Sequence, residues 1–195
     1  MADCVIRRGS NDPLRIALMS YNQLDWPTLR LMRERLMVFW QKKGNVGIGS
    51  KAPDFTLPSQ SGEMVNLTDF WDRKPVVLFF YPKDNTPGCI KEACAFRDRY
   101  EEFGKLDAEV VGISSDSVES HRSFAREHGL PFTLLSDEGG KVRKLYDVPN
   151  TFGLLPGRVT YVIDEKGVVR HVFSSQLGAK KHVEEAQKVL TSIGC

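Results

Sequence analysis

Two adjoining stretches in the middle of the chain decide its fold, Pro75-Val-Val-Leu-Phe-Phe-Tyr81 and Pro82-Lys-Asp-Asn-Thr-Pro-Gly-Cys-Ile-Lys-Glu-Ala-Cys94. The first is a short apolar run between prolines, which predicts a fully buried strand. The second predicts the start of a helix, because Thr86 suits the N-cap, Pro87 suits the first helical position, and Cys89 then falls at the third. Strands mixed with helices in this way are typical of an α/β sheet that is covered on both faces.

The predicted position of Cys89 favours its thiolate form. In the first turn of a helix the sulfur lies among backbone N–H groups that have no carbonyl partner in the helix, at the positive end of the helix dipole. Both features stabilise a negative charge on sulfur, and the thiolate is the nucleophilic form of cysteine. Cys89 is therefore a candidate nucleophile.

Cys94 adds a geometric constraint. Apolar and small residues at helical spacing predict a helix over residues 89–103, namely Cys89, Ala93, Phe96, Tyr100 and Phe103. Five residues of ideal helix separate two Cα atoms by about 8.6 Å, whereas a disulfide needs Cα atoms closer than roughly 7 Å. Cys89 and Cys94 can therefore bond only if the first part of the helix unwinds, which suits a catalytic disulfide better than a structural one.

The remaining predicted elements continue the alternation of strands and helices. The strands are 55–57, 65–67, 109–115 and 132–135, followed by a hairpin of 159–164 and 168–173, and the helices are 117–129, 139–146 and 180–192. The four histidines (His121, His128, His171 and His182) show no ligand spacing, and the sequence assigns them no role.

The motif Pro82-x-x-x-Thr86-x-x-Cys89 resembles the active site of the peroxiredoxins, and the five-residue step to Cys94 resembles the atypical two-cysteine branch called peroxiredoxin Q or bacterioferritin comigratory protein. The resemblance covers roughly residues 47–193 and continues through three further segments, Gly112–Asp116, Leu130–Asp137 and Pro156–Asp164. It implies a thioredoxin-like α/β fold with a mixed central sheet flanked by helices.

The resemblance also implies a function, a thiol peroxidase for hydrogen peroxide and organic hydroperoxides in antioxidant defence and redox homeostasis. Cys89 would become a sulfenic acid, and Cys94 would resolve it as an intramolecular disulfide. Arg158 would pair with the thiolate, the Thr86 hydroxyl would bond the sulfur or the peroxide in addition to capping the helix, and Pro82 would shield the pocket. The implied reductant is thioredoxin or a similar dithiol. No metal, haem or flavin is implied, and a monomer is expected.

Two other functional classes remain open. A thioredoxin-like disulfide reductase normally carries C-x-x-C, and the four-residue gap between Cys89 and Cys94 counts against it. A non-enzymatic redox sensor would use the same residues as a peroxidase. It would be oxidised by peroxide without sustained turnover, which separates the two.

Composition agrees with an ordinary globular enzyme. The chain has 195 residues, of which 41% are hydrophobic and 27% charged, and its net charge of +2 gives no reason to expect nucleic acid or an acidic membrane as partner. No stretch is apolar enough to predict a transmembrane helix. The four cysteines, Cys4, Cys89, Cys94 and Cys195, lack the spacing of a zinc site or a secreted disulfide framework. A reducing compartment, the cytoplasm, is expected.

Residues 1–46 lie outside the resemblance and are interpreted as an N-terminal extension to a domain of residues 47–195. Apolar residues at three- and four-residue steps predict a short amphipathic helix over 27–43, namely Leu29, Met32, Leu36, Phe39 and Trp40. The alternative is a weakly ordered tail. A transit peptide is rich in serine and poor in acidic residues, and this segment is neither. A plastid location is therefore the alternative to the cytoplasm, and it applies if the extension is a targeting segment.

Overall fold

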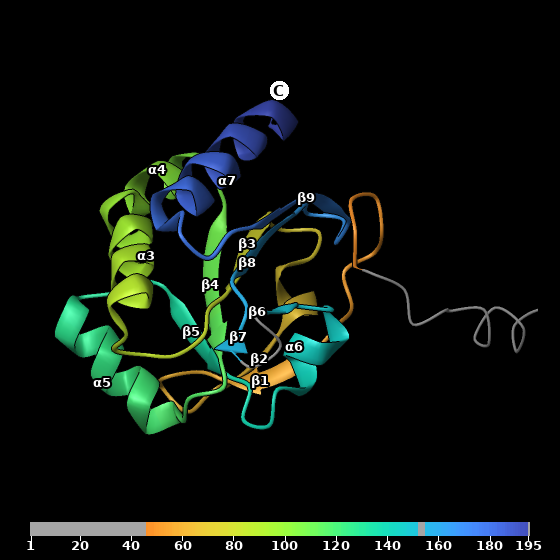
Figure 1. Cartoon of the computed structure of the whole chain (residues 1–195). Helices are drawn as coiled ribbons and strands as arrows, with labels where there is room; N and C mark the ends of the chain where they lie inside the picture. The colour runs from red at the N-terminus through yellow and green to blue at the C-terminus, as the bar shows by residue number, and fades with distance from the viewer. Residues whose placement is uncertain (1–45, 152–154, 195) are drawn as a thin grey trace, which may run out of the picture. The chain divides into compact units, whose positions relative to one another are not determined.

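The computed structural model describes residues 46–151 and 155–194, so the predicted helix over 27–43 lies outside the described residues. In chain order the elements are β1 (Thr56–Pro58), β2 (Met64–Asn66), the 3-10 helix η2 (Leu67–Phe70), β3 (Val76–Phe80), α3 (Pro87–Asp98), α4 (Tyr100–Lys105), β4 (Glu109–Ser114), α5 (Val118–His128), β5 (Thr133–Ser136), α6 (Lys141–Leu145), β6 (Asn150–Thr151), β7 (Leu155–Pro156), β8 (Val159–Ile163), β9 (Val169–Ser174) and α7 (Ala179–Ile193) (Figure 1).

A five-stranded mixed sheet organises the domain, with the strand order β5-β4-β3-β8-β9. β3 runs parallel to β4 and antiparallel to β8, and β8 forms the predicted hairpin with β9. In the β3–β8 pair, Phe80 at the end of β3 lies opposite Val159 at the start of β8. This register brings the residues after β3 close to the residue before β8, although about 70 positions separate them in the chain.

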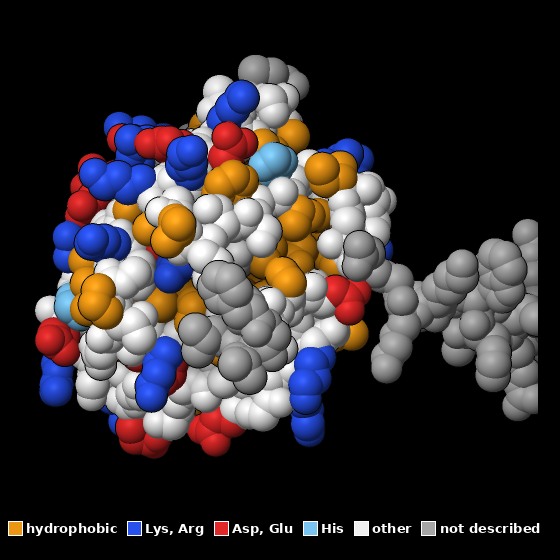
Figure 2. All heavy atoms as spheres, viewed as in Figure 1, with side chains coloured by type: hydrophobic (Ala, Val, Ile, Leu, Met, Phe, Trp, Pro, Cys, Tyr) orange, Lys and Arg blue, Asp and Glu red, His pale blue; other side chains and the backbone are white. Residues whose placement is uncertain are grey.

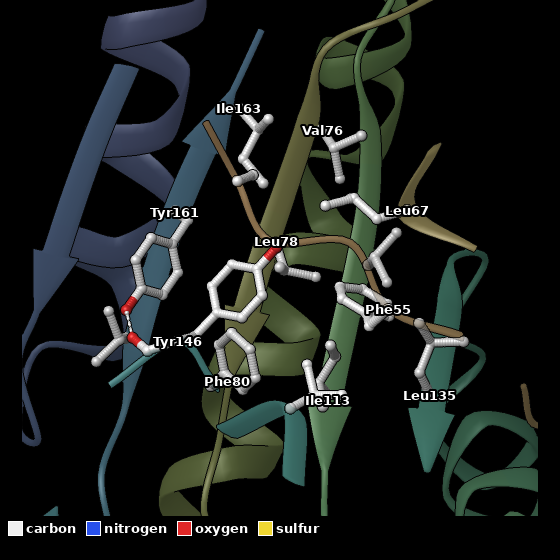
Figure 3. Close-up of a cluster of buried hydrophobic side chains, with 14 of the residues drawn as sticks. Phe55, Leu67, Val76, Leu78, Phe80, Ile113, Leu135, Tyr146, Tyr161 and Ile163 are labelled. Carbon is white, nitrogen blue, oxygen red and sulfur yellow. Dashed lines mark hydrogen bonds between the residues drawn. The ribbon is translucent and has the colours of Figure 1, made fainter. Parts of the chain in front are cut away.

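Alternate side chains of β3 enter two different cores, which is the pattern of a strand buried on both faces. Val76, Leu78 and Phe80 pack on the face covered by the β1–β2 hairpin and α6, where Figure 3 shows Leu78 and Phe80 beside Tyr146 and Val76 beside Leu67. The Tyr161 hydroxyl donates to the Tyr146 carbonyl at 2.7 Å in this core. On the opposite face Val77 and Phe79 pack under α3, α4, α5 and α7, which lie together on one side of the sheet in Figure 1.

The predicted helix over 89–103 is wrong as one element. The chain forms two helices, because Arg99 leaves helical geometry at φ −116° and ψ 14° and its N–H bonds the Phe96 carbonyl, three residues back. Phe96 and Phe103 still share one core, so apolar spacing alone did not reveal the break. The short elements η2, β6 and β7 were not predicted either, since two to four residues carry no detectable period.

On the face that Figure 2 presents, basic and acidic side chains are interspersed rather than gathered into a patch of one sign. None of the helices within the described ranges is long and apolar enough to cross a bilayer.

Candidate active site

Cys89 lies where the sequence predicted, at the third position of α3. Thr86 is the N-cap residue with an extended backbone, Pro87 follows at the first position, and the Cys89 side chain is buried, 2% exposed. The first helical hydrogen bond joins the Ile90 N–H to the Thr86 carbonyl at 2.9 Å. The N–H groups of Gly88 and Cys89 therefore precede the hydrogen-bonded part of the helix and are available to an anion.

Thr86 is the N-cap residue, as predicted, but its side chain makes no capping hydrogen bond to the helix. The Thr86 hydroxyl donates to the Lys83 carbonyl at 3.1 Å, and its oxygen accepts no bond from the helix. The loop before α3 turns back on itself here, with Asn85 in the left-handed region at φ 57°. Thr86 and Pro82, both partly buried, lie in this loop between β3 and α3.

Arg158 meets Cys89 because of the sheet register. Arg158 directly precedes β8, opposite the end of β3, and its guanidinium is almost completely buried. Its Nη2 lies 3.4 Å from the Cys89 Sγ, and its Nη1 donates to Glu92 Oε2. A Cβ atom at Gly88 would lie only 3.2 Å from Nη2, so the glycine leaves room for the guanidinium.

Glu92 is a site residue that the sequence analysis missed. It lies one helical turn after Cys89 with 0% exposure, and Arg158 is its cationic partner. Burial raises the pKa of Glu92 to about 8, against the opposing charge and hydrogen bonds of Arg158. Glu92 Oε1 is buried without a hydrogen-bond partner among the described residues. The sequence feature that could have revealed Glu92 is its position on the apolar side of the helix, between Cys89 and Ala93, where a carboxyl group is unusual.

His182 of α7 borders the same cluster, with Nδ1 at 3.6 Å from Glu92 Oε1. Its Nε2 lies 2.9 Å from the Ser175 carbonyl, which only accepts, so Nε2 carries the proton. Nδ1 then accepts from the Thr160 hydroxyl at 2.8 Å. Burial lowers the pKa of His182 to about 4, which agrees with a neutral ring. The sequence feature that could have revealed His182 is its spacing from Ala186 and Leu190, which places it on the buried face of α7.

Arg143 of α6 joins the two chain segments that form the site. Its Nη2 donates to the Tyr81 carbonyl at 2.5 Å, and its Nη1 donates to the Gly157 carbonyl at 2.8 Å. Tyr81 precedes the loop to α3 and Gly157 precedes Arg158, so Arg143 ties the thiol side of the site to the guanidinium side. Burial lowers the Arg143 pKa, while the charges of Asp137, Cys89 and Tyr81 act in the opposite direction. No sequence pattern marked this residue.

Cys94 lies on α3 with Cys89, partly buried, and both thiols are free. The reduced protein therefore holds the two cysteines on one helix, five residues apart. In an intact helix the Cα atoms of two residues five positions apart are too far from each other for a disulfide.

Comparisons with known proteins identify the family to which the chain belongs. The family model described as AhpC/TSA family matches residues 48–172. Peroxiredoxin Q, chloroplastic, from Sedum lineare is 58% identical over 146 residues, covering 74% of this chain and 78% of that protein. The protein of the same name from Triticum aestivum is 54% identical over 151 residues, covering 77% and 69% of the two chains.

Solved structures of two bacterial proteins share the fold. Peroxidoxin BcpB from Mycobacterium tuberculosis superposes with a TM-score of 0.71 at 39% identity, covering 76% of this chain and 99% of that one. A peroxiredoxin Q mutant from Xylella fastidiosa superposes with a TM-score of 0.72 at 29% identity, covering 78% and 99%. The mixed sheet flanked by helices is thus the thioredoxin fold that the sequence predicted. The chain belongs to the AhpC/TSA family and, within it, to the peroxiredoxin Q group of thiol peroxidases.

Proposed function

We propose that this chain reduces hydrogen peroxide and organic hydroperoxides through Cys89, stores the oxidising equivalents as a Cys89–Cys94 disulfide, and is reset by thioredoxin or a similar dithiol. The observation that carries the proposal is the 3.4 Å contact between Arg158 Nη2 and the Cys89 sulfur at the start of α3. It places a cation and unpaired backbone N–H groups around one buried thiol.

The first step is attack of the Cys89 thiolate on the terminal oxygen of the peroxide. The S–O bond forms as the O–O bond breaks, so the sulfur is oxidised to a sulfenic acid and the peroxide leaves as an alkoxide or hydroxide that takes up a proton. Negative charge moves from sulfur to the leaving oxygen during this step. Arg158 and the N–H groups of the first turn are donors fixed in place to stabilise that charge. The Thr86 hydroxyl and Pro82 would complete the pocket around the peroxide.

The second step is resolution by Cys94. The thiol of Cys94 attacks the Cys89 sulfenic sulfur, a disulfide forms and water leaves. Since both residues lie on α3 in the reduced protein, the helix between them has to open first. The third step is thiol–disulfide exchange, in which an external dithiol is oxidised and both cysteines return to thiols.

The test is peroxide consumption by the full chain with thioredoxin, thioredoxin reductase and NADPH, compared between hydrogen peroxide and an alkyl hydroperoxide. Sustained NADPH oxidation that requires the chain is the expected result. One turnover followed by arrest with every dithiol supplied would contradict the proposal and favour the redox sensor, whose oxidation also uses Cys89.

The compartment is a further part of the proposal. The relatives from wheat and Sedum are named chloroplastic, which favours the plastid alternative over the cytoplasm expected from the sequence. Residues 1–46 would then act as the targeting extension to the domain of residues 47–195. Import of the full chain into isolated plastids, with shortening on entry, is the expected result. Exclusion from plastids would contradict it.

A further inference from the structure

A second buried polar cluster lies outside the thiol site and centres on Asp84 in the loop between β3 and α3. The Asp84 carboxylate is buried and accepts a hydrogen bond from the Tyr81 hydroxyl at 2.7 Å and from the Ser120 hydroxyl at 2.7 Å. Its Oδ2 also lies 2.9 Å from Nδ1 of His121, a residue of α5 with 0% exposure. The Asp84 backbone N–H donates to Asp116 at 2.9 Å.

The partners of the His121 ring assign its protons. Nε2 lies 3.2 Å from the Leu135 carbonyl, which can only accept, so Nε2 carries a proton. Nδ1 faces the Asp84 carboxylate, which also accepts while it is ionised. The Tyr81 hydroxyl also lies 3.3 Å from Nδ1, but its proton is donated to Asp84 Oδ1 over the shorter distance of 2.7 Å, so its oxygen faces Nδ1 as an acceptor. Burial together with Asp84 raises the Tyr81 pKa well above its usual value. His121 therefore needs a proton on Nδ1 as well, and the pair is an imidazolium facing a carboxylate.

Two further features agree with an ionised Asp84. Burial acts to raise its pKa, but the hydrogen bond and charge of His121, with the Tyr81 and Ser120 bonds, lower the pKa below its usual value. His121 lies in the first turn of α5, where the helix dipole disfavours a cation. The anionic Asp84 offsets both the dipole and the imidazolium. The other titratable groups at the cluster are Tyr81 directly after β3 and Asp116 after β4, while β5 contributes only a carbonyl.

This cluster fixes the segment that positions the nucleophile. Asp84 is two residues before the N-cap of α3 and five residues before Cys89. Between Asp84 and the helix, Asn85 takes the left-handed φ of 57°, a conformation that asparagine adopts more readily than most non-glycine residues. The contacts of Asp84 to Ser120 and His121 of α5 and to Asp116 hold the residue before this turn from outside the thiol site.

We propose that the Asp84–His121 ion pair is a positioning device that holds the loop of residues 82–86, and with it the first turn of α3, in the geometry that Cys89 needs to react with peroxide. The inference rests on the proposed role of Cys89. Neither residue touches the peroxide. Both act by setting the direction in which the helix starts, and a displacement of about 1 Å at a reacting atom is enough to cost one to two orders of magnitude in rate.

The first test observes the charges directly in the full reduced chain. Nitrogen-15 NMR of the His121 ring is expected to show both nitrogens protonated at neutral pH in the wild type. In Asp84→Asn, which keeps the shape of the side chain and removes its charge, one ring nitrogen is expected to lose its proton. A neutral His121 ring in the wild type would overturn the inference, whether or not the chain reduces peroxide.

The second test measures the rate of Cys89 oxidation by hydrogen peroxide in stopped flow, across pH. His121→Asn retains an N–H donor near the Nδ1 position without the charge, and is expected to lower the rate constant by about tenfold where the pair is charged. The ratio of wild-type to variant rates is expected to change with pH, because only the wild type carries an ionisable ring at this position. A ratio independent of pH would indicate an effect of shape alone and would overturn the inference.

Glu119→Gln is the matched control, because it changes a charge in the same helical turn on the exposed side of α5. Its rate is expected to equal the wild-type rate. Ser120→Ala removes a single donor to Asp84 and supplies the answer if His121→Asn does not fold. It is expected to slow Cys89 oxidation severalfold and to speed amide exchange over residues 84–90. A wild-type rate in folded Ser120→Ala and His121→Asn would contradict the proposal. If Cys89→Ser retained peroxide turnover, the proposed function would fail instead.

Discussion

Arg158 Nη2 lies 3.4 Å from the Cys89 sulfur, although Arg158 precedes β8 and Cys89 lies in the first turn of α3. The same guanidinium also bonds Glu92, so one buried cation serves a thiol and a carboxyl group on the same helix. The three groups are coupled. A negative charge on Glu92 partly neutralises Arg158 and so weakens the attraction between Arg158 and the Cys89 thiolate.

Replacement of the nucleophile tests the centre of the proposal. Cys89→Ser is expected to abolish peroxide turnover, because a serine hydroxyl remains protonated and is a far weaker nucleophile. The measurement is peroxide consumption with thioredoxin and its reductase, with circular dichroism to verify folding. Retention of more than a few per cent of the wild-type rate would remove Cys89 from this role.

Arg158→Lys keeps a positive charge and loses the planar fork that reaches Cys89 and Glu92 together. The second-order rate constant with peroxide is expected to fall by ~10²-fold, the scale of losing one donor to a developing oxyanion. Stopped-flow kinetics of the first oxidation measure it. An unchanged rate constant would show that the contact seen in the reduced protein does not act in the transition state.

Opening of α3 is expected to accompany disulfide formation. Peroxide treatment of the wild type should speed amide hydrogen exchange over residues 88–97, because Cys89 and Cys94 cannot bond within an intact helix. Cys94→Ser should remove this change, stall at the sulfenic acid, lose turnover supported by thioredoxin and become more prone to over-oxidation. Mass spectrometry follows both species. Equal exchange in reduced and oxidised wild type would refute the opening.

Gly88→Ala tests the space beside the guanidinium. A Cβ there would lie 3.2 Å from Arg158 Nη2, so we expect the side chain to shift by a few tenths of an ångström and the peroxide rate to fall severalfold. Gly104→Ala is the matched control, because Gly104 is also helical and its Cβ would meet no atom within 4 Å. It is expected to keep the wild-type rate and to gain up to about 1 kcal/mol of stability from helix propensity. Equal rates in the two variants would show that Arg158 tolerates the methyl group.

Glu92 makes stability depend on pH. Its pKa is raised from 4.5 to about 8 by burial, so between these values the folded state keeps a proton that the unfolded state has released. The free energy of unfolding should therefore fall as pH rises from about 5 to 8. In Glu92→Gln this contribution is absent, and urea unfolding across that range should show a shallower decline. Glu101→Gln, on the exposed side of α4, is the control. Parallel curves for wild type and Glu92→Gln would mean that Glu92 is ionised throughout.

The amino-acid sequence by itself determined the elements and the chemistry of the nucleophile. The apolar run before Pro82 and the Thr86-Pro87 helix start are local signals, and β3, α3 and the position of Cys89 follow from them. The same local logic placed the β8–β9 hairpin and α7. It could not detect the break at Arg99, because the apolar spacing from Phe96 to Phe103 continues through it.

The family resemblance named Arg158 as the partner of the thiolate, but only the tertiary structure explains how distant groups come to surround the thiol. Arg158 reaches Cys89 because Phe80 pairs with Val159 across an antiparallel ladder, and a pairing register is a property of two strands rather than of either sequence. The charges of Glu92, His182 and Asp84 depend on burial and on partners from other elements. Desolvation and Coulomb interactions are set by distances in space, so these residues acquire their roles only when the chain has folded.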